Sequence, residues 1–275
     1  MNTQVKKDLA RFYEQVGTRY PEEDEVYGTL RGMLRKRFVS AFLGERRGAL
    51  LDIGCNRGLY LAVYRGGPRF GVDLSANVLR QARSRLDAHL AAADAEYLGC
   101  FRPGSFDSIL CSEVIEHCLD PAAVLRGIHR LLKSGGRALV TTPNYRGARP
   151  RWIGLGVLER YGICSDCARG YYHTAYHPGE LAAMARSAGL AVIESGTLER
   201  EVKYAAKIPA LLLHVGRGLN RVLRSPRLAR ANERLFHGLT RLIYHFAHWT
   251  GLEKLLLPLC RHGVRSYIIV SKEDA

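Results

Sequence analysis

The sequence lacks any long uninterrupted run of apolar residues. No stretch reaches the roughly 18 to 20 apolar residues that a membrane-spanning helix needs. The first residues, MNTQVKKDLARFYEQ, have neither the apolar region nor the small-residue cleavage site of a secretory signal. We therefore expect a cytoplasmic protein, with peripheral attachment to the inner face of the membrane as an option.

A disulfide framework and a four-cysteine zinc site are also missing. The seven cysteines, an odd number, are scattered from Cys55 to Cys260, which suits a reducing compartment. Cys164 and Cys167 form one CxxC motif, but there is no second CxxC to complete a zinc site. We interpret these two residues as free thiols in a loop.

Acidic residues are much scarcer than basic ones. The chain has 26 Asp and Glu against 41 Lys and Arg, a formal net charge of +15. Residues 198–265 alone hold 13 Lys and Arg against four Glu, a net charge of +9. This excess predicts an anionic partner, either phospholipid headgroups or nucleic acid, with a solvated basic face as the alternative.

What is present is a regular alternation of strand-like and helical stretches. The 275 residues, 47% of them hydrophobic, are enough for one sizeable core with additions or for two small domains. From residue 49 onward, ALLDIG, RFGVDLS, SFDSILCSE and RALVTTPN read as strands. LYLAVYR, ANVLRQARSRLDAHL and PAAVLRGIHRLLK read as helices between them. The alternation predicts an α/β fold with a Rossmann-like, doubly wound, mostly parallel sheet.

The remainder of the chain adds helices to this sheet. Residues 1–45 are expected to form an N-terminal helical segment, and SYIIVSK near the end reads as the last strand. We assign the sheet domain to residues 46–197 and 266–275. The basic, Leu-rich residues 198–265 are expected to form a helical insertion before the last strand.

A glycine turn follows the first expected strand. Asp52 ends that strand in LLDIGCNRG, and Gly54 and Gly58 flank the turn before the next helix. Glycines there let the backbone approach a ligand, and the helix start offers unpaired N–H groups. The GxGxxG spacing of a dinucleotide site is absent, so that interpretation is weak.

Three carboxylates surround this turn. Asp73 ends the second strand in FGVDLS, where an acid can accept hydrogen bonds from both ribose hydroxyls. Asp94, in ADAEYLG, is placed where a third strand should end and could bind an adenine amino group. Together with Asp52, these residues indicate a ligand with a ribose, an adenine and a cationic tail, as in S-adenosylmethionine.

From about residue 49 to 196 the order of motifs resembles that of class I S-adenosylmethionine-dependent methyltransferases, specifically the type 11 group that includes O-methyltransferases of ubiquinone biosynthesis. The matching motifs are LLDIGCNRG, FGVDLS, DAEYLG, SFDSILCSEVIEH and LLKSGGRALVTTPN. The resemblance implies cofactor contacts at Asp52, Gly54, Asn56, Gly58, Asp73, Leu74, Asp94, Ala95 and Cys111.

One departure from the family pattern is Asn56, where the family usually has a third glycine. Asparagine tolerates a left-handed backbone better than other non-glycine residues, so we expect the turn to be retained. If Asn56 instead blocks the methionine moiety of the cofactor, the chain would be a degenerate, non-catalytic cofactor-binding module.

The SEVIEH stretch carries the candidate catalytic residues Glu113, Glu116 and His117. On a helical turn, residues at i, i+3 and i+4 share a face, so the three side chains should converge. His117 could act alone as a general base. Alternatively, the three could bind a divalent metal such as Mg, Mn or Zn that lowers the pKa of a substrate hydroxyl. Helix capping and surface polarity remain the third interpretation.

The metal interpretation has support from two resemblances. The membrane-associated O-methyltransferases of ubiquinone biosynthesis have a similar SEV-x-EH stretch. The small-RNA 2′-O-methyltransferases have a similar E-x-x-E-H followed by a later histidine that completes a metal site. Here the later histidine would be His173 or His177. The resemblance therefore implies a tentative metal site of Glu113, Glu116, His117 and His173.

Residues 145–176 follow the fifth strand, where a substrate-side loop or lid is expected. Trp152, Tyr161, Tyr171 and Tyr172 could line an aromatic pocket there, or could pack without a role in binding.

The insertion contains two amphipathic stretches, over residues 208–223 and 228–249, with arginines among the apolar positions. A basic amphipathic helix with a tryptophan near its end is typical of a membrane-surface segment. Nucleic-acid binding would instead favour aromatics spread across a basic groove. Packing against the sheet or in an oligomer is the remaining alternative.

These features together predict an S-adenosylmethionine-dependent methyltransferase. Its acceptor is expected to be a hydroxyl of a hydrophobic or lipid-like small molecule at the membrane surface. The alternatives are an RNA 2′-O-methyltransferase and the non-catalytic module.

Overall fold

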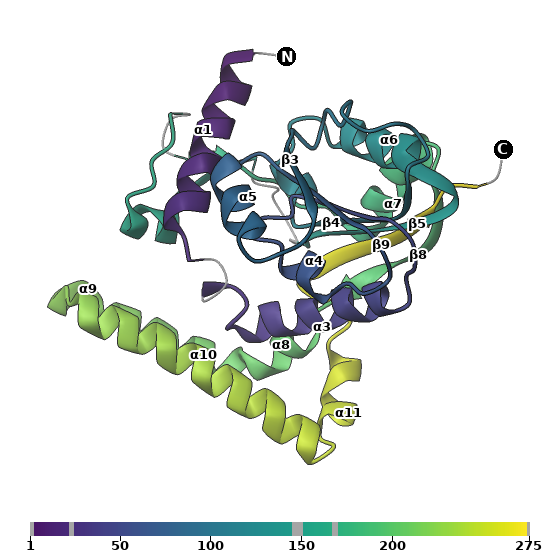
Figure 1. Cartoon of the computed structure of the whole chain (residues 1–275). Coiled ribbons are helices and arrows are strands. Elements are labelled where there is room, and N and C mark those ends of the chain that lie inside the picture. The colour runs from purple at the N-terminus through teal and green to yellow at the C-terminus, as the bar shows by residue number, and fades with distance from the viewer. Residues whose placement is uncertain (1–2, 22–24, 145–150, 167–169, 274–275) are drawn as a thin grey trace. The chain divides into compact units, whose positions relative to one another are not determined.

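The computed structural model describes residues 3–21, 25–144, 151–166 and 170–273 (Figure 1). The chain divides into two compact units. The catalytic unit comprises Met1–Pro21, Phe38–Gly196 and Arg265–Ala275, and the helical unit comprises Glu22–Arg37 and Thr197–Val264. The N-terminal helices are divided between the two units.

The catalytic unit is built on a seven-stranded sheet with the order β3-β2-β1-β4-β5-β9-β8. Its strands are β1 (Leu50–Ile53), β2 (Arg69–Asp73), β3 (His89–Ala92), β4 (Phe106–Ser112), β5 (Leu132–Pro143), β8 (Ala191–Leu198) and β9 (Arg265–Ser271). The strands from β3 to β5 pair in parallel, whereas β9 is antiparallel to β5. The predicted mostly parallel, doubly wound sheet is confirmed, and its strand order reverses between β1 and β4. In such sheets this reversal marks the ligand site.

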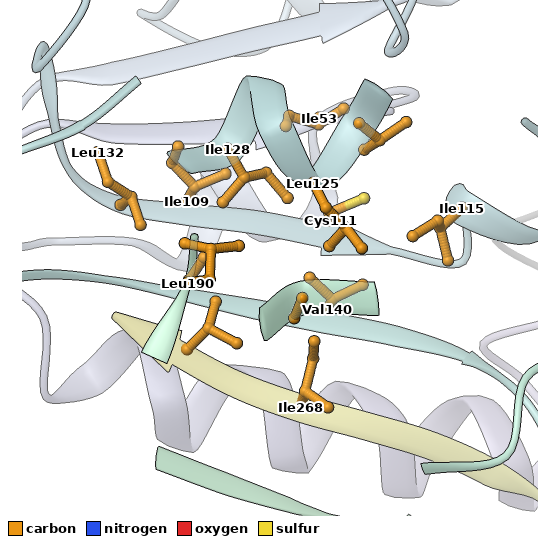
Figure 2. Close-up of a cluster of buried hydrophobic side chains, with 14 of the residues drawn as sticks. Ile53, Ile109, Cys111, Ile115, Leu125, Ile128, Leu132, Val140, Leu190 and Ile268 are labelled. Atoms are coloured by element: carbon orange, nitrogen blue, oxygen red, sulfur yellow. The ribbon is translucent and has the colours of Figure 1, made fainter. Parts of the chain in front are cut away.

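Alternate residues of the strands are buried on both faces of this sheet. One face forms a large core with α6 (Pro121–Leu131) and α7 (Pro178–Ser187), to which Ile53, Ile109, Val140 and Ile268 contribute. Figure 2 shows Leu125 and Ile128 of α6 over the strand that carries Ile109 and Cys111. Adjacent strand residues such as Leu50 and Leu110 are equally buried on the other face. Burial on both sides explains why the strands read as continuous apolar runs.

Short polar caps define where the crossover helices begin. Ser75 accepts a hydrogen bond from Val78 N at the start of α5 (Ala76–Arg83). Asp120 caps α6 in the same way, with Pro121 in its first turn. Both are residues that favour helix starts. The helix after the glycine turn, α4 (Leu59–Val63), has Gly58 as its N-cap.

One predicted helix boundary was wrong. We predicted a helix over residues 76–90, but α5 ends at Arg83, and His89 and Leu90 belong to β3. The helical periodicity of RSRLDAHL is overridden because β3 pairs in parallel with β2. The Arg83 guanidinium, at the end of α5, donates to Leu90 O at 2.7 Å and so joins the helix end to the strand.

The segment after β5 is more regular than the loop that we expected. It contains β6 (Trp152–Gly154) and β7 (Gly170–Tyr172), which form a two-stranded sheet, and the 3-10 helix η2 (Gly156–Tyr161). Leu155 and Ile163 pack there against Phe12 of α1 (Thr3–Arg19). The first helix is thus attached to the substrate-side segment.

The helical unit has a small core of its own. It consists of the first part of α3 (Leu30–Gly44), α8 (Glu201–Ala205), α9 (Lys207–Leu223), α10 (Pro226–Trp249), α11 (Glu253–Leu256) and the 3-10 helix η3 (Leu257–Leu259). Leu30, Val202, Tyr244 and Ala247 are buried together in this core. The helical insertion before the last strand is present as predicted. Among the helices described, none is both long and apolar enough to cross a membrane.

Candidate functional site

The glycine turn after β1 has the backbone geometry that its sequence predicted. Gly54, Asn56 and Gly58 all have positive φ angles, of 72°, 48° and 79°. A Cβ on Gly54 would lie 2.2 Å from a Val114 methyl carbon, so only glycine fits. Asn56 adopts the left-handed conformation, so the turn is retained as expected. The contact between Gly54 and Val114 places the turn next to the SEVIEH stretch, which contains Val114.

Two of the predicted carboxylates meet at this turn. Asp73 Oδ2 accepts from Asn56 N, and its Oδ1 accepts from Ser75 N, both at 2.9 Å. Asp52 is 2% exposed, and its Oδ2 has no hydrogen-bond partner among the described residues. Burial, and then the charge of Asp73, raise the pKa of Asp52 well above its usual value. A buried carboxylate without a donor suits a cationic ligand group.

Asp94, the third predicted carboxylate, is held by the N-terminal helix. Its Oδ2 lies 2.7 Å from Lys6 Nζ, which also lies 3.0 Å from Glu96. Asp94 Oδ1 accepts from Glu96 N at 2.9 Å. Farther along α1, Gly17 O lies 3.4 Å from Arg57 Nη2 in the glycine turn. Helix α1 therefore contacts both the turn and the end of β3.

The remaining predicted cofactor residues differ in accessibility. Leu74 is partly exposed directly after β2, and Ala95 is half-buried beside Asp94. Cys111 lies in the core of β4, and Figure 2 shows it among buried apolar side chains. Burial raises the pKa of its thiol. The Cys111 side chain therefore packs the core and offers a ligand no accessible thiol.

Glu113 departs from the single helical face that we expected for SEVIEH. It has a φ of 61°, and the 3-10 helix η1 begins only at Ile115 (Ile115–His117). Its carboxylate accepts from Thr141 Oγ1 at 3.0 Å and forms an ion pair with Arg265 of β9. The left-handed backbone turns this side chain toward β5 and β9, away from the face of Glu116 and His117.

His173, rather than Glu113, forms a group with Glu116 and His117. One ligand atom from each of the three residues lies within 4.8 Å of the other two, a spacing that could hold a metal ion. In the part of the chain that the structure describes, Glu113 does not belong to this group. Thr174 N donates to Glu116 O at 2.9 Å, which brings the segment after β7 onto η1.

The backbone fixes the orientation of the His117 ring. His117 Nδ1 lies 3.3 Å from Tyr172 O, and because a carbonyl can only accept, Nδ1 carries the proton. Nε2 then presents its lone pair, 4.0 Å from Glu116 Oε1. Burial, followed by the nearby His173, lowers the pKa of His117 to about 4, so the ring is neutral at neutral pH.

Aromatic side chains form a wall beside this cluster. The His117 ring centroid lies 5.5 Å from that of Tyr13 and 5.9 Å from that of Tyr171. Tyr171 stacks on Phe12 at 5.1 Å. The Tyr13 hydroxyl is buried and has no partner among the residues described, and burial raises its pKa. Its electrostatic neighbours include both Asp73 and Glu116.

The other predicted aromatic residues lie farther from this cluster. Tyr172 contacts His117 through its backbone, Trp152 packs on the Tyr172 ring, and Tyr161 packs on Tyr20. Of the CxxC pair, Cys164 is exposed and donates a hydrogen bond to Gln15, whereas Cys167 lies outside the described residues.

Sequence reasoning left His173 and His177 as alternatives and did not single out Tyr13, Lys6 or Arg265. His177 caps α7, where Nδ1 accepts from Gly179 N. The HPGE sequence is a signal for such a cap, since a proline follows and a glutamate completes a capping box. No local signal marks Tyr13 or Arg265, because only the tertiary fold brings them to SEVIEH.

Known proteins resemble this chain in sequence. A family model described as a methyltransferase domain matches residues 51–140. The ubiquinone biosynthesis O-methyltransferase of Pseudomonas paraeruginosa is 30% identical over 196 residues, which cover 67% of this chain and 83% of that protein. The protein of the same name from Xanthomonas oryzae pv. oryzae is 33% identical over 166 residues, covering 57% and 68%.

A solved structure extends the likeness to the fold. It is the Burkholderia thailandensis 1,6-didemethyltoxoflavin-N1-methyltransferase with 1,6-didemethyltoxoflavin and S-adenosylhomocysteine bound. The TM-score is 0.57 at 16% identity, over 100% of this chain and 92% of that one. The glycine turn, the carboxylates around it and these relatives agree: the chain belongs to the class I S-adenosylmethionine-dependent methyltransferases.

Proposed function

We propose that this methyltransferase acts on a hydroxyl group of a hydrophobic or lipid-like small molecule. The observation that carries the proposal is the group of Glu116, His117 and His173 beside an aromatic wall, next to the glycine turn. A hydroxyl must lose its proton to become a good nucleophile, and this group is suited to assist that loss. Relatives at about 30% identity are named as O-methyltransferases, which also supports a hydroxyl acceptor.

The proposed cofactor site uses the carboxylates according to their surroundings. Asp73, whose oxygens already accept two backbone N–H groups, would bind the ribose hydroxyls with its remaining lone pairs. Asp52, whose Oδ2 is buried without a donor among the described residues, would bind the cationic amino group. Asp94 and Ala95 would lie on the adenine side. The Gly54–Gly58 turn would bring the backbone close to the methionine moiety, and the bound cofactor supplies the electrophilic methyl group.

We propose further that Glu116, His117 and His173 hold a divalent cation. The donor set of one carboxylate and two imidazoles fits Mn or Zn better than Mg, which prefers oxygen ligands. When bound, such an ion lowers the pKa of an acceptor hydroxyl. Tyr172 O orients His117 for this role, a second contact that metal-binding histidines commonly have. Glu113 would then act as a positioning residue, since it ties the turn to Thr141 and Arg265.

His117 as a lone general base is the alternative. The same burial that keeps the ring neutral makes it a weak proton acceptor, because its pKa of about 4 lies far from neutrality. Together with the converging ligand atoms of Glu116, His117 and His173, this low basicity supports assistance by a cation rather than a lone imidazole base.

The aromatic wall supports a hydrophobic acceptor. Tyr13 and Tyr171 present ring surface beside His117, and rings of this kind suit an aromatic or unsaturated acceptor. A hydrophobic acceptor would be held in a bilayer, so we also propose that the enzyme works at an anionic membrane surface.

Paired probes test the acceptor proposal. Transfer of a labelled methyl group would be measured to a phenol and to an aniline that carry the same alkyl chain. We expect methylation of the phenol, and a His117→Ala variant should lose it while binding S-adenosylhomocysteine normally. Methylation of the aniline alone, or full phenol methylation by the variant, would contradict the proposal.

A further inference from the structure

The helical unit exposes an unusual share of apolar side chains. Of the 20 large hydrophobic side chains exposed among the described residues, 14 lie between Ile208 and Leu259. They are carried by α9, α10 and the segment that follows. Scattered exposed apolar residues are normal, but a contiguous group indicates a binding surface.

On α9 the exposed apolar side chains occupy one face. They are Ile208, Leu211, Leu212, Val215, Leu219, Val222 and Leu223. At about 100° per residue these seven positions fall within an arc of roughly 120°. The neighbouring arc of α9 meets α10, because Leu213 O accepts from Asn232 Nδ2 at 3.1 Å and Gly216 lies against Asn232. The apolar face of α9 is therefore left exposed.

On α10 a second apolar stripe lies opposite the buried face. Leu235, Leu242, Phe246 and Trp249 are all more than half exposed. Thr240, Tyr244 and Ala247, which are buried, lie about 120° to 180° away around the helix. Trp249, 84% exposed, ends the helix.

The two stripes lie on the same side of the hairpin. Only Arg224 and Ser225 connect α9 to α10. Gly216 and Asn232, each eight residues from Arg224, contact one another, so the two helices run antiparallel. On each helix, the residues that contact the other helix lie about a quarter turn from the apolar stripe. The direction of this rotation is the same on both helices. Reversing the direction of one helix then brings both stripes to one side. They form a single surface, which we call the hairpin face.

Arginines flank the hairpin face. Arg227, Arg234 and Arg241 recur every seven residues along α10, at about 70° to 110° from the centre of its stripe. All three are exposed, and in the described part of the chain none forms an ion pair. Residues 207–249 contain eight Lys and Arg against one acid, Glu233, which already pairs with Arg217 at 2.7 Å.

We propose that the hairpin face of α9 and α10 docks on an anionic lipid bilayer. An apolar stripe edged by arginines, with a tryptophan at its end, matches the acyl boundary below a layer of anionic headgroups. A second copy of this chain would bring a like-charged hairpin against it, which disfavours self-association. Nucleic acid would leave the valine and leucine side chains without an apolar partner.

The biological role of this docking rests on the proposed function, since docking would give the enzyme access to a hydrophobic acceptor in the bilayer. The evidence for docking, however, comes from the helical unit alone. Vesicle binding and methyl transfer can therefore fail separately.

The test is flotation of the full-length protein with lipid vesicles. Vesicles of phosphatidylcholine with roughly one third phosphatidylglycerol would be compared with phosphatidylcholine alone. We expect binding to the anionic vesicles that is weakened by salt. The R227Q/R234Q/R241Q variant should bind on the order of a hundredfold more weakly, since each charge contributes about fivefold.

An apolar variant, L211Q/V215Q/V222Q, should also lose at least about tenfold in vesicle affinity, and this loss should persist at high salt. The matched control is V63Q/I193Q, which alters exposed apolar side chains of the catalytic unit and should bind like the wild type. Helical content and S-adenosylhomocysteine affinity would be measured for every variant. Wild-type levels of both show that a loss of vesicle binding comes from the altered surface.

Three results would overturn the proposal. The first is equal binding of the wild type and both triple variants to anionic vesicles. The second is a wild-type dimer without lipid that the apolar variant converts to a monomer. The third is salt-sensitive RNA binding without vesicle binding. Vesicle binding as expected, but without methyl transfer to either probe, would leave the docking surface standing and refute the proposed acceptor.

Discussion

Asp52 and Asp73 lie side by side at the glycine turn, yet their carboxylates have different surroundings. Asp73 accepts two backbone N–H groups, whereas Asp52 Oδ2 is buried without a donor among the described residues. We therefore expect them to recognise different parts of the cofactor.

Asp52→Asn should separate these roles. The change keeps the shape of the side chain and removes the charge that would bind the cationic amino group. We expect S-adenosylhomocysteine to bind on the order of tenfold more weakly, the loss of one charge-assisted hydrogen bond. 5′-Methylthioadenosine, which has the ribose and adenine but no amino group, should bind as before. Equal weakening of both ligands in calorimetric titrations would show that Asp52 acts through the fold of the turn.

His173→Ala should remove the metal site and His177→Ala should not. Both histidines follow β7, but only His173 belongs to the ligand group, while His177 caps α7. Titration of the metal-free proteins with Mn²⁺, followed by electron paramagnetic resonance, should give one site in the wild type and in His177→Ala. In His173→Ala the affinity should fall at least tenfold. Similar Mn²⁺ affinity in all three proteins would contradict the proposed ligands.

Tyr13→Phe should reduce activity without reducing stability. The buried hydroxyl has no partner among the described residues, so its removal should leave the free energy of unfolding unchanged or raise it by up to about 1 kcal/mol. If the hydroxyl positions the acceptor, kcat/KM for methyl transfer should fall about tenfold. Urea unfolding and steady-state kinetics provide the two readouts, and a loss of stability with normal kcat/KM would reduce Tyr13 to a packing residue.

At the scale of elements, the turn between β1 and α4 is constrained both in backbone conformation and in space. Gly54 and Gly104 both have positive φ angles, but a Cβ at Gly54 would meet Val114 at 2.2 Å and a Cβ at Gly104 would meet nothing within 4 Å. Both glycines therefore have a left-handed backbone, but only Gly54 lacks room for a side chain.

Gly104→Ala should cost about 1 kcal/mol of stability, the strain of a left-handed alanine. Gly54→Ala should cost about 2 to 4 kcal/mol, because the clash with Val114 is added to that strain. It should also weaken S-adenosylhomocysteine binding. Thermal unfolding and calorimetry measure the two effects, and equal destabilisation by both substitutions would contradict the account of the turn.

Local patterns predicted most of the elements, but not the contacts between them. Alternating apolar stretches indicated the parallel sheet, since burial on both faces leaves a strong signal in each strand. The end of α5 was missed because pairing with β2, which is not encoded locally, draws His89 and Leu90 into β3. In the same way, SEVIEH indicated a functional turn. Its residue spacing predicted one helical face and gave no sign of the left-handed backbone of Glu113.

For the molecule as a whole, the site depends on segments far apart in the sequence. Residues near 52, 73 and 94 were predictable as a group because parallel strands end at one edge. The approach of α1 through Lys6, and of His173 through the backbone bond from Thr174 to Glu116, depends on tertiary packing that no short motif specifies. Sequence patterns therefore indicated the carboxylates around the glycine turn better than the residues that surround His117.

Binding of cofactor should stabilise the catalytic unit. At S-adenosylhomocysteine concentrations of about one hundred times the dissociation constant, the free energy of unfolding should rise by about 2.7 kcal/mol. Hydrogen exchange should slow in β1, β2 and α1, which contact the turn, and remain unchanged in α9 and α10. Protection confined to the helical unit would place the ligand elsewhere.

The central claim is that the glycine turn with Asp73 is the cofactor site of this methyltransferase. Calorimetric titration of the wild type and of Asp73→Ala with S-adenosylhomocysteine tests it most directly, with Asp87→Ala as a control at an exposed acid. We expect one micromolar site in the wild type and in the control, and a loss of about 1 to 3 kcal/mol of binding free energy in Asp73→Ala. Unchanged affinity in Asp73→Ala, or no binding by the wild type, would contradict the claim.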